Sequence, residues 1–435
     1  MHNIENNKIE LKESISLVIG NMIGAGIFML PVSLSVYGSI SIMGWAISAS
    51  MAFILSIIFK RLSSKYPGES GPFHYTEKSF GEFIGFFIVW GYWISILLVN
   101  ASLAIVVTSY STIFIENLNK PIYSILFSVT VIILIASINL SGIKKVGKFQ
   151  YVTTFLKIIP LLLAVIISFF VFDINNFFPI NISQETNIEA ITVTTALTFF
   201  AFLGIESATI PTDKIKNPKE TVPKATIIGT VLTIFIYISS SIAIFGILHP
   251  NEISMSNAPF ADAIGIILGD YGRNLIAIFA IISALGSLNG WTLLQIEIPK
   301  NLAKKKLFSK LFMELNSRGV PHKGLIISTI LVSILIGINY SKSLSNIFTY
   351  LILTSTFCTL VLYFFISLSE ILISFYNNEK DKSVYINSLM TGVPAFLFCI
   401  WMVVGVGIES IISGTLLLSL SLPIYIYQKK YVKSR

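Results

Sequence analysis

Two apolar stretches of the chain contain the residues best suited to chemistry. Ile19–Phe28 holds three glycines, and Phe200–Ser207 places Gly204 two residues before Glu206. Glycine at this density weakens a helix and allows backbone dihedrals that other residues avoid. A break inside an apolar helix frees backbone N–H groups, which suit a carboxylate, and C=O groups, which suit an ammonium. An α-amino acid carries both of these groups.

The composition indicates which elements must position these stretches. Of 435 residues, 54% are hydrophobic and 12% are charged, whereas about 25% are charged in soluble domains. The 30 Lys and Arg and the 22 Asp and Glu residues are too few to cover soluble domains of this total length. A soluble enzyme, a nucleic-acid-binding protein and a disordered scaffold are therefore not expected. Cys358 and Cys399 lie in apolar runs, so neither a disulfide framework nor a metal cluster is expected.

Twelve apolar runs are long enough to cross about 30 Å of hydrocarbon. Lipid offers the backbone no hydrogen bonds, so each run must be helical or have its irregular part buried in protein. The sequence therefore predicts an all-α membrane protein, a single integral-membrane domain over residues 1–435 with twelve transmembrane helices. The predicted spans are Ile15–Val36, Ile42–Phe59, Ile84–Val107, Pro121–Ile138, Val152–Phe172, Thr192–Ile210, Ala225–Leu248, Leu275–Leu294, Gly324–Tyr340, Leu344–Ile366, Leu389–Val406 and Ile411–Tyr427.

The cations are distributed unequally between the two sides of these spans. Lys120, Arg273 and Lys342 belong to one set of alternate loops, and Lys157 lies inside a span. The other 26 of the 30 cations lie in the opposite set of loops and in the two terminal segments. Loops rich in Lys and Arg stay in the cytoplasm, so both termini are predicted to be cytoplasmic. The short loops favour a bacterial plasma (inner) membrane.

The two glycine-containing stretches lie at matching positions of an internal repeat. Gly24 and Gly204 are 180 residues apart, and the spans that follow them keep nearly this spacing. Five helices over about 15–172 are thus followed by five more over about 192–366, with two further helices over about 389–427. An odd number of helices per repeat inverts the second copy. Interrupted helices at matching positions of inverted repeats indicate the substrate site of a transporter.

Each feature also has an ordinary interpretation. Gly20 and Gly24, four residues apart, could form a packing face between helices. Glu206 could be a helix-terminal acid that reaches the headgroups, and Lys157 could extend its ammonium to the interface. The coincidence of two breaks favours the substrate site. Burying an unpaired lysine is costly, which favours a functional role for Lys157.

Five motifs carry a resemblance to a known family. With them the chain resembles the amino acid–polyamine–organocation permeases and is most similar to the basic amino acid/polyamine antiporters, especially arginine/agmatine exchangers. The resemblance extends from about Ile9 to the last span and implies the leucine-transporter architecture, with two inverted five-helix repeats plus two helices. The motifs are Gly20–Pro31, Gly204–Ala208, Lys216–Lys219, Gly286–Leu294 and Cys399–Trp401.

The resemblance implies roles for individual residues. Backbone around Ala25 and Gly26 would hold a substrate carboxylate. The carbonyls of Met22, Phe200 and Leu203 would hold its α-ammonium. A tryptophan ring would face a cationic side chain, because the ring face attracts an ammonium or a guanidinium. The residues assigned to substrate binding are Asn21, Met22, Gly24, Ala25, Gly26, Ser95, Asn100, Phe200, Leu203, Gly204, Trp291 and Ser355.

A second group matches gating and proton-coupling positions. Tyr92, Glu206 and Tyr363 match the family's cytoplasmic-side gate, and Glu206 and Lys157 are the candidates for proton coupling. In the broader amino acid permeases, a lysine at the position of Lys157 takes the place of a structural sodium ion between the first, fifth and eighth helices. Ordinary alternatives are core packing for Trp291, interhelical hydrogen bonds for Asn100 and Ser355, and an interfacial position for Tyr363.

Three residues depart from the exchangers' pattern. Ala25 stands where the exchanger has serine, Phe200 where it has tryptophan, and Lys157 where it has a small apolar residue. The expected function is exchange of a basic amino acid for its amine or polyamine product by alternating access. Proton-coupled amino acid symport, favoured by Lys157, and a non-transporting amino acid sensor are the alternatives.

The expected partners follow from this function. They are an amino acid or polyamine substrate, protons and the lipid bilayer, without nucleic acid, cofactor or metal ion. A homodimer is compatible with the resemblance, because the family contains both dimers and monomers. An enzyme is not expected, since all four histidines fall outside the predicted spans or at their edges.

Overall fold

The computed structural model describes residues 8–67, 71–210, 212, 215–338, 343–376 and 382–432. Within these ranges the chain is helical, and β-pairing is limited to two isolated bridges. The helices in chain order are α2 (Leu11–Met22), α3 (Ala25–Ser35), α4 (Ser41–Lys65), α5 (Gly71–Phe80), α6 (Glu82–Ser111), α7 (Pro121–Asn139), α8 (Ile143–Val171), α9 (Asn187–Phe200), α10 (Pro218–Ile247), α11 (Pro250–Met255), α12 (Pro259–Lys304), α13 (His322–Ile338), α14 (Leu344–Tyr376), α15 (Lys382–Gly405), α16 (Ile408–Ser419) and α17 (Ser421–Tyr427).

Ten helical segments of the described chain are long and apolar enough to cross a membrane, with α2 and α3 counted as one and α16 and α17 as another. The other two predicted spans correspond to α9, which has 14 residues, and α13, which has 17. The prediction of an all-helical membrane protein is therefore confirmed. The count of twelve transmembrane helices and their inverted repeat remain predictions.

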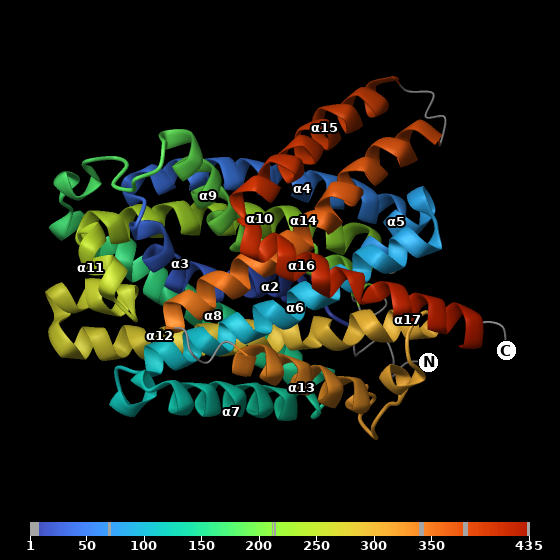
Figure 1. Ribbon diagram of the computed structural model, residues 1–435, viewed down its shortest axis with the longest axis horizontal. Helices are drawn as coiled ribbons and strands as arrows, with labels where there is room; N and C mark the ends of the chain where they lie inside the picture. The colour runs from blue at the N-terminus through green and yellow to red at the C-terminus, as the bar shows by residue number, and fades with distance from the viewer. Residues whose placement is uncertain are drawn as a thin grey trace.

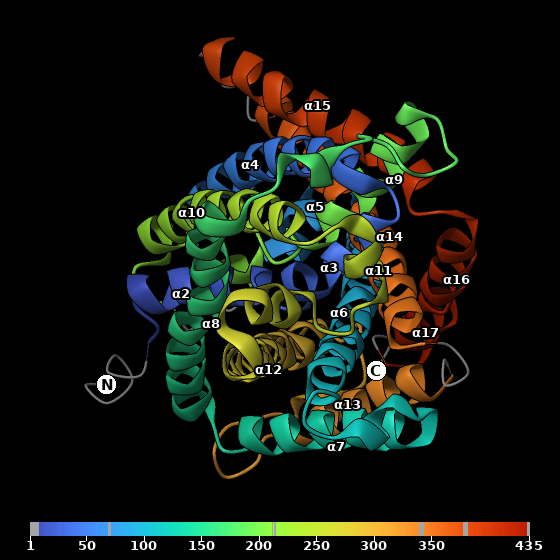
Figure 2. The same ribbon diagram turned by 90° about the vertical axis from the view of Figure 1, so that its left-hand side faces the viewer.

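The helices form an elongated bundle in which α6 and α12 occupy the interior. α12 packs against both α6 and α8, and α6 packs along α14. In both views α15 lies at the upper edge, and α7 and α13 lie together at the lower edge (Figures 1 and 2). α5 and α17 lie at one end of the bundle and α11 at the other (Figure 1).

Burial separates the inner helices from the outer ones. Almost every residue of α6 is buried, whereas Phe169 on α8 is 81% exposed and Phe235 on α10 is 70% exposed. Exposed large apolar side chains on this scale would make a water-facing surface prone to aggregation. They fit a lipid-facing surface. Cys358 and Cys399 are both buried and free.

Two helices differ from the sequence expectation for local reasons. α12 spans 46 residues, well beyond the predicted Leu275–Leu294, and consists of two helical segments joined by a kink at Gly269, where φ is +59° and ψ is −160°. Residues other than glycine rarely adopt a backbone φ in this range. α5 lies in a loop of the predicted topology. It is the short helix that follows α4 at the end of the bundle shared with α17 (Figure 1).

Candidate functional site

The first break separates α2 from α3. α2 ends at Met22, Ile23 is extended with ψ 94°, and α3 begins at Ala25. Gly24 leaves the space that the break needs, because a Cβ there would lie 2.7 Å from Ser287 Oγ. The sequence therefore interrupts the helix at a close contact with α12. The Ala25 side chain lies outside the described part of the structure.

The second break follows α9, which ends at Phe200. Turns cover residues 201–206, and a short 3-10 helix begins at Ser207. Gly204 has a φ of +108°, in the left-handed region that favours glycine. A Cβ on Gly204 would lie 3.2 Å from Asn21 Cβ and 3.3 Å from the Trp291 ring. The two breaks, predicted from glycines 180 residues apart, thus lie next to each other.

Hydrogen bonds join the two breaks directly. Asn21 Nδ2, on the last turn of α2, donates to Ser207 Oγ at 2.9 Å. The Tyr237 hydroxyl, on α10, donates to the Met22 carbonyl and reaches the Ala201 carbonyl at 3.1 Å. One phenol therefore contacts a freed carbonyl from each interrupted helix.

A small cavity of about 230 Å³ lies between the breaks. Trp291 lies in its wall, with its indole N–H held by the Asn21 carbonyl at 2.9 Å. The cavity thus combines two aromatic rings with backbone of both interrupted helices. Its lining includes six residues assigned to substrate binding from the sequence, namely Asn21, Met22, Gly26, Phe200, Leu203 and Trp291, together with Val99, Leu103 and Ala201.

The other polar candidates lie outside the cavity lining. Ser95 Oγ donates to the carbonyl of Tyr92 within α6, and Ser355 Oγ on α14 donates to the Ser95 carbonyl at 3.1 Å. Asn100 Nδ2 donates to the side-chain oxygen of Gln295 on α12. All three side chains therefore connect buried helices in this conformation. Gly24 and Gly204 lie at the breaks themselves.

Lys157 lies fully buried on α8 and holds the end of α2. Its ammonium donates to the carbonyls of Gly20 and Ile23 at 2.7 and 2.8 Å and to Ser287 Oγ at 2.8 Å. An ammonium has three donors, so each is matched by one acceptor. The carbonyls at a helix C-terminus carry partial negative charge. The ammonium thus occupies a position between α2, α8 and α12.

Glu206 is fully buried just beyond the second break. One carboxylate oxygen accepts from the Tyr92 hydroxyl, and the other accepts from the Tyr363 hydroxyl at 2.6 Å. The structure thus brings together the three residues assigned to the gate. Among the described residues, no lysine or arginine forms an ion pair with this carboxylate. Its two partners are neutral donors.

The chain was compared with known proteins. Residues 9–422 match the amino acid permease family. The cadaverine/lysine antiporter of Escherichia coli (strain K12) is 29% identical, covering 98% of this chain and 95% of the antiporter. A putative arginine/ornithine antiporter of Bacillus subtilis (strain 168) is 30% identical over 80% of each chain. The arginine/agmatine antiporter of Chlamydia abortus is 27% identical, covering 94% of this chain and 87% of that protein.

The chain belongs to the amino acid permease family. The antiporter-like recognition made from the motifs is thereby confirmed, and the relatives' names indicate a transporter rather than an enzyme. Together with the apolar helices, this makes the permease a multi-pass membrane protein.

Sequence reasoning missed two residues of this permease's breaks. Ser287 accepts from Lys157 and contacts the carbonyls of Gly20 and Ile23 at 2.7 Å each. Ser287 lies in the motif Gly286–Leu294, which carries part of the family resemblance, and this motif was the signal for it in the sequence. Tyr237 carries no such signal, because a tyrosine in an apolar helix is equally typical of packing.

Proposed function

We propose that this permease exchanges a basic amino acid for its amine or polyamine product by alternating access. The observation that supports this most is the cavity between two interrupted helices, with Trp291 and Phe200 in its wall. Interrupted helices at a midplane cavity are typical of transporter substrate sites. The relatives named as antiporters of lysine, arginine and their amines support the same substrate class.

In the proposed binding mode the substrate lies between the breaks. The backbone N–H groups at the start of α3, around Ala25 and Gly26, receive the carboxylate. The carbonyls of Met22, Phe200 and Leu203 receive the α-ammonium, and the Trp291 ring faces the cationic side chain. Ser95, Asn100 and Ser355 become accessible to substrate only when α6 and α14 move relative to the breaks.

The proposed architecture has twelve transmembrane helices, with two inverted repeats over about 15–172 and 192–366 and further helices over about 389–427. Alternating access then moves α2–α3, α4, α9 and α10 against the remaining scaffold. In support of a moving unit, α4 packs on both α9 and α10, and α10 packs on α2. Both termini face the cytoplasm in this proposal.

Proton-coupled uptake of amino acids is the second candidate, and Lys157 favours it. In either mode Tyr92, Glu206 and Tyr363 form the proposed cytoplasmic-side gate, and Glu206 and Lys157 are the candidates for proton coupling. The Lys157 ammonium, held by two carbonyls and a hydroxyl, would take the place of a structural sodium ion. The two candidates differ in whether uptake needs internal substrate.

Counterflow into proteoliposomes tests the proposal. Vesicles are preloaded with lysine, arginine, ornithine or the corresponding amine, and uptake of each labelled compound is measured with and without a proton gradient. The expected result is uptake of a basic amino acid that depends on an internal amine. Uptake that ignores internal substrate but responds to the proton gradient would instead support symport and contradict exchange.

The same assay tests the departures from the exchanger pattern. Phe200→Trp and Ala25→Ser restore the exchanger's residues singly and together. We expect a lower KM for arginine in the double variant, because a larger ring and a hydroxyl donor are added near the substrate. An unchanged or higher KM for every basic substrate would contradict the proposed binding mode.

A further inference from the structure

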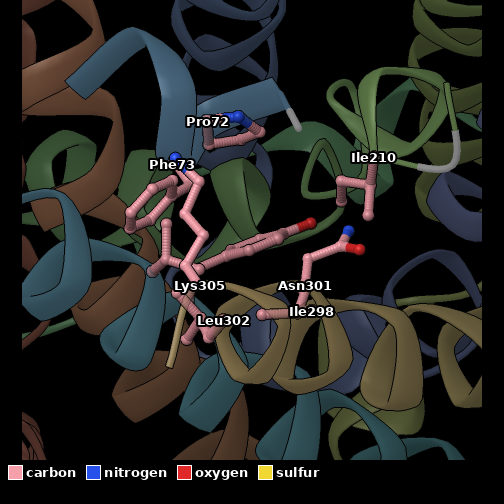
Figure 3. Close-up of a pocket in the computed structure, with 9 residues that line it drawn as sticks. Pro72, Phe73, Ile210, Ile298, Asn301, Leu302 and Lys305 are labelled. Atoms are coloured by element: carbon pink, nitrogen blue, oxygen red, sulfur yellow. The ribbon is translucent and has the colours of Figure 1, made fainter. Parts of the chain in front are cut away.

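A second cavity of about 360 Å³ lies beyond the Glu206 cluster. Tyr92 belongs to both places, because its side chain lines this cavity and its hydroxyl donates to Glu206. Ile210, just after the second break, is also in the wall. Figure 3 shows the Lys305 side chain running beside the Phe73 ring, with Asn301 and Ile210 across the cavity.

One face of α12 continues from the first cavity to the second. Trp291 lines the first cavity, whereas Ile298 and Lys305, at successive intervals of seven residues, line the second. Seven residues are about two helical turns and about 10 Å of rise, so Trp291 and Ile298 share one face of α12, and Lys305 follows directly after the last residue of the helix. A path along this face would lead from the first cavity, past the Tyr92–Glu206 contact, to the second.

The outer wall of the second cavity already holds a cation. Lys305 Nζ lies 4.2 Å from the centre of the Phe73 ring and pairs with the Glu77 carboxylate. Phe73 and Glu77 are four residues apart on α5, which places them on the same face of that helix. A ring face beside a carboxylate is suited to an alkylammonium.

We propose that Phe73 and Glu77 form a transit site for the cationic end of a basic amino acid or a diamine, which the Lys305 ammonium fills in this structure. The substrate class rests on the proposed function. A lysine side chain and a 1,5-diaminoalkane end in the same alkylammonium, so contacts that hold Lys305 fit the substrate. The Lys305 and Glu77 side chains are 38% and 28% exposed, and ion pairs this accessible are weak enough to be displaced.

Exchange kinetics from each face of oriented proteoliposomes test the transit site with 1,5-diaminopentane. Glu77→Gln and Phe73→Leu should each raise KM at the face that carries α5, by about two- to fivefold. Lys305→Gln removes the competing ammonium and should lower KM at that face. None of the three variants should change KM at the opposite face. Equal changes at both faces, or no change in any variant, would overturn the proposal.

Lys310→Gln is the matched control for this experiment. Lys310 is an exposed lysine five residues beyond Lys305, outside the cavity lining. Its substitution changes the charge of this end of the molecule by the same amount as Lys305→Gln. If Lys310→Gln lowered the KM for 1,5-diaminopentane at the face that carries α5 as much as Lys305→Gln does, then net charge, rather than the transit site, would set this KM.

A binding measurement decides the question without transport. Purified protein is treated with an amine-acylating reagent, and mass spectrometry measures how much Lys305 is modified. The measurement is repeated with increasing concentrations of pentamethonium. This compound is a quaternary diammonium, which the reagent cannot modify. If pentamethonium displaces the Lys305 ammonium from the transit site, the modification of Lys305 should increase, whereas that of Lys310 should not. In the Glu77→Gln variant, pentamethonium should no longer increase the modification of Lys305. Constant Lys305 modification overturns the transit site. If the rise occurs but no basic amino acid is exchanged, the transit site stands and the proposed function fails.

Discussion

Lys157 and Glu206 are a buried lysine and a buried glutamate beside the breaks, and they have different kinds of partner. The Lys157 ammonium is held by the backbone carbonyls of Gly20 and Ile23 and by a serine hydroxyl. The Glu206 carboxylate is held by two tyrosine hydroxyls from α6 and α14. Lys157 therefore fixes the shape of the first break, while Glu206 ties the second break to the scaffold.

Lys157→Met should lower the stability of the permease and its exchange rate. Methionine keeps an apolar side chain but has no hydrogen-bond donor. The Ser287 hydroxyl can donate to only one of the Gly20 and Ile23 carbonyls at a time, so the other loses its partner. An unpaired buried acceptor costs about 1–3 kcal/mol. The melting temperature in detergent and exchange in proteoliposomes measure the effect. Lys219→Met, at an exposed lysine, is the control, and equal behaviour of both variants would contradict this role.

Glu206→Gln should remove the pH dependence of transport. Glutamine cannot gain or lose a proton and resembles the protonated acid, so the variant should behave at every pH as the wild type does at its acid limit. Uptake across a pH series measures this. Glu220→Gln, at an exposed glutamate, should keep the wild-type profile. A Glu206→Gln profile that also matches the wild type would exclude Glu206 as the proton sensor.

At the scale of elements, the close approach of the first break to α12 depends on two glycines, one in the break and one on α12. A Cβ on Gly24 would lie 2.7 Å from Ser287 Oγ, and one on Gly290 would lie 2.1 Å from Asn21 Oδ1. Where α2 and α12 meet, the Trp291 indole N–H also donates a hydrogen bond to the Asn21 carbonyl. The helix pair thus fixes both the break and the ring in the cavity wall.

Gly290→Ala should separate α12 from α2 and reduce substrate affinity. The added methyl requires Asn21 to move, which disturbs its bond to Ser207 and the Trp291 contact. Binding of basic amino acids to the purified protein measures the loss. Gly337→Ala is the control, because a Cβ there meets nothing within 4 Å, and alanine in a helix is favoured by up to about 1 kcal/mol. Unchanged binding in Gly290→Ala would show that the helix contact is not needed.

For the whole molecule, the uneven distribution of cations predicts its orientation in the membrane. The structure places α5 and α17 at one end of the bundle and α11 at the other (Figure 1). In the predicted topology α5 and α17 belong to the cytoplasmic side and α11 to the opposite side. The two ends of the bundle thus correspond to the two predicted sides.

Cysteine labelling in intact cells tests this orientation. Both native cysteines are buried, so a membrane-impermeant maleimide should report a single introduced cysteine. Lys120→Cys should react from outside, whereas Lys219→Cys should react only after the cells are opened, because it lies in a lysine-rich loop. The reverse pattern would mean that the chain inserts with its termini outside.

Sequence alone determined that the chain is helical and apolar, where its helices break, and which family it resembles. These properties depend on local residue type, because transfer into lipid and glycine's freedom act on short stretches. Six residues that line the cavity had been assigned to substrate binding through the family resemblance. The limits of α12 were not predicted, because a non-helical kink at Gly269 joins a further helical segment to the predicted span.

Only the tertiary structure decided which side chains donate hydrogen bonds to the backbone carbonyls that are freed where the helices are interrupted. Tyr237 reaches the carbonyl of Met22 across 215 residues, and Ser287 reaches that of Ile23 across 264. It also placed Asn100 on Gln295 rather than in the cavity lining. Such partners depend on how distant helices pack, and no local pattern encodes that. The same holds for the pairing of Lys305 with Phe73 and Glu77, which joins α5 to the end of α12.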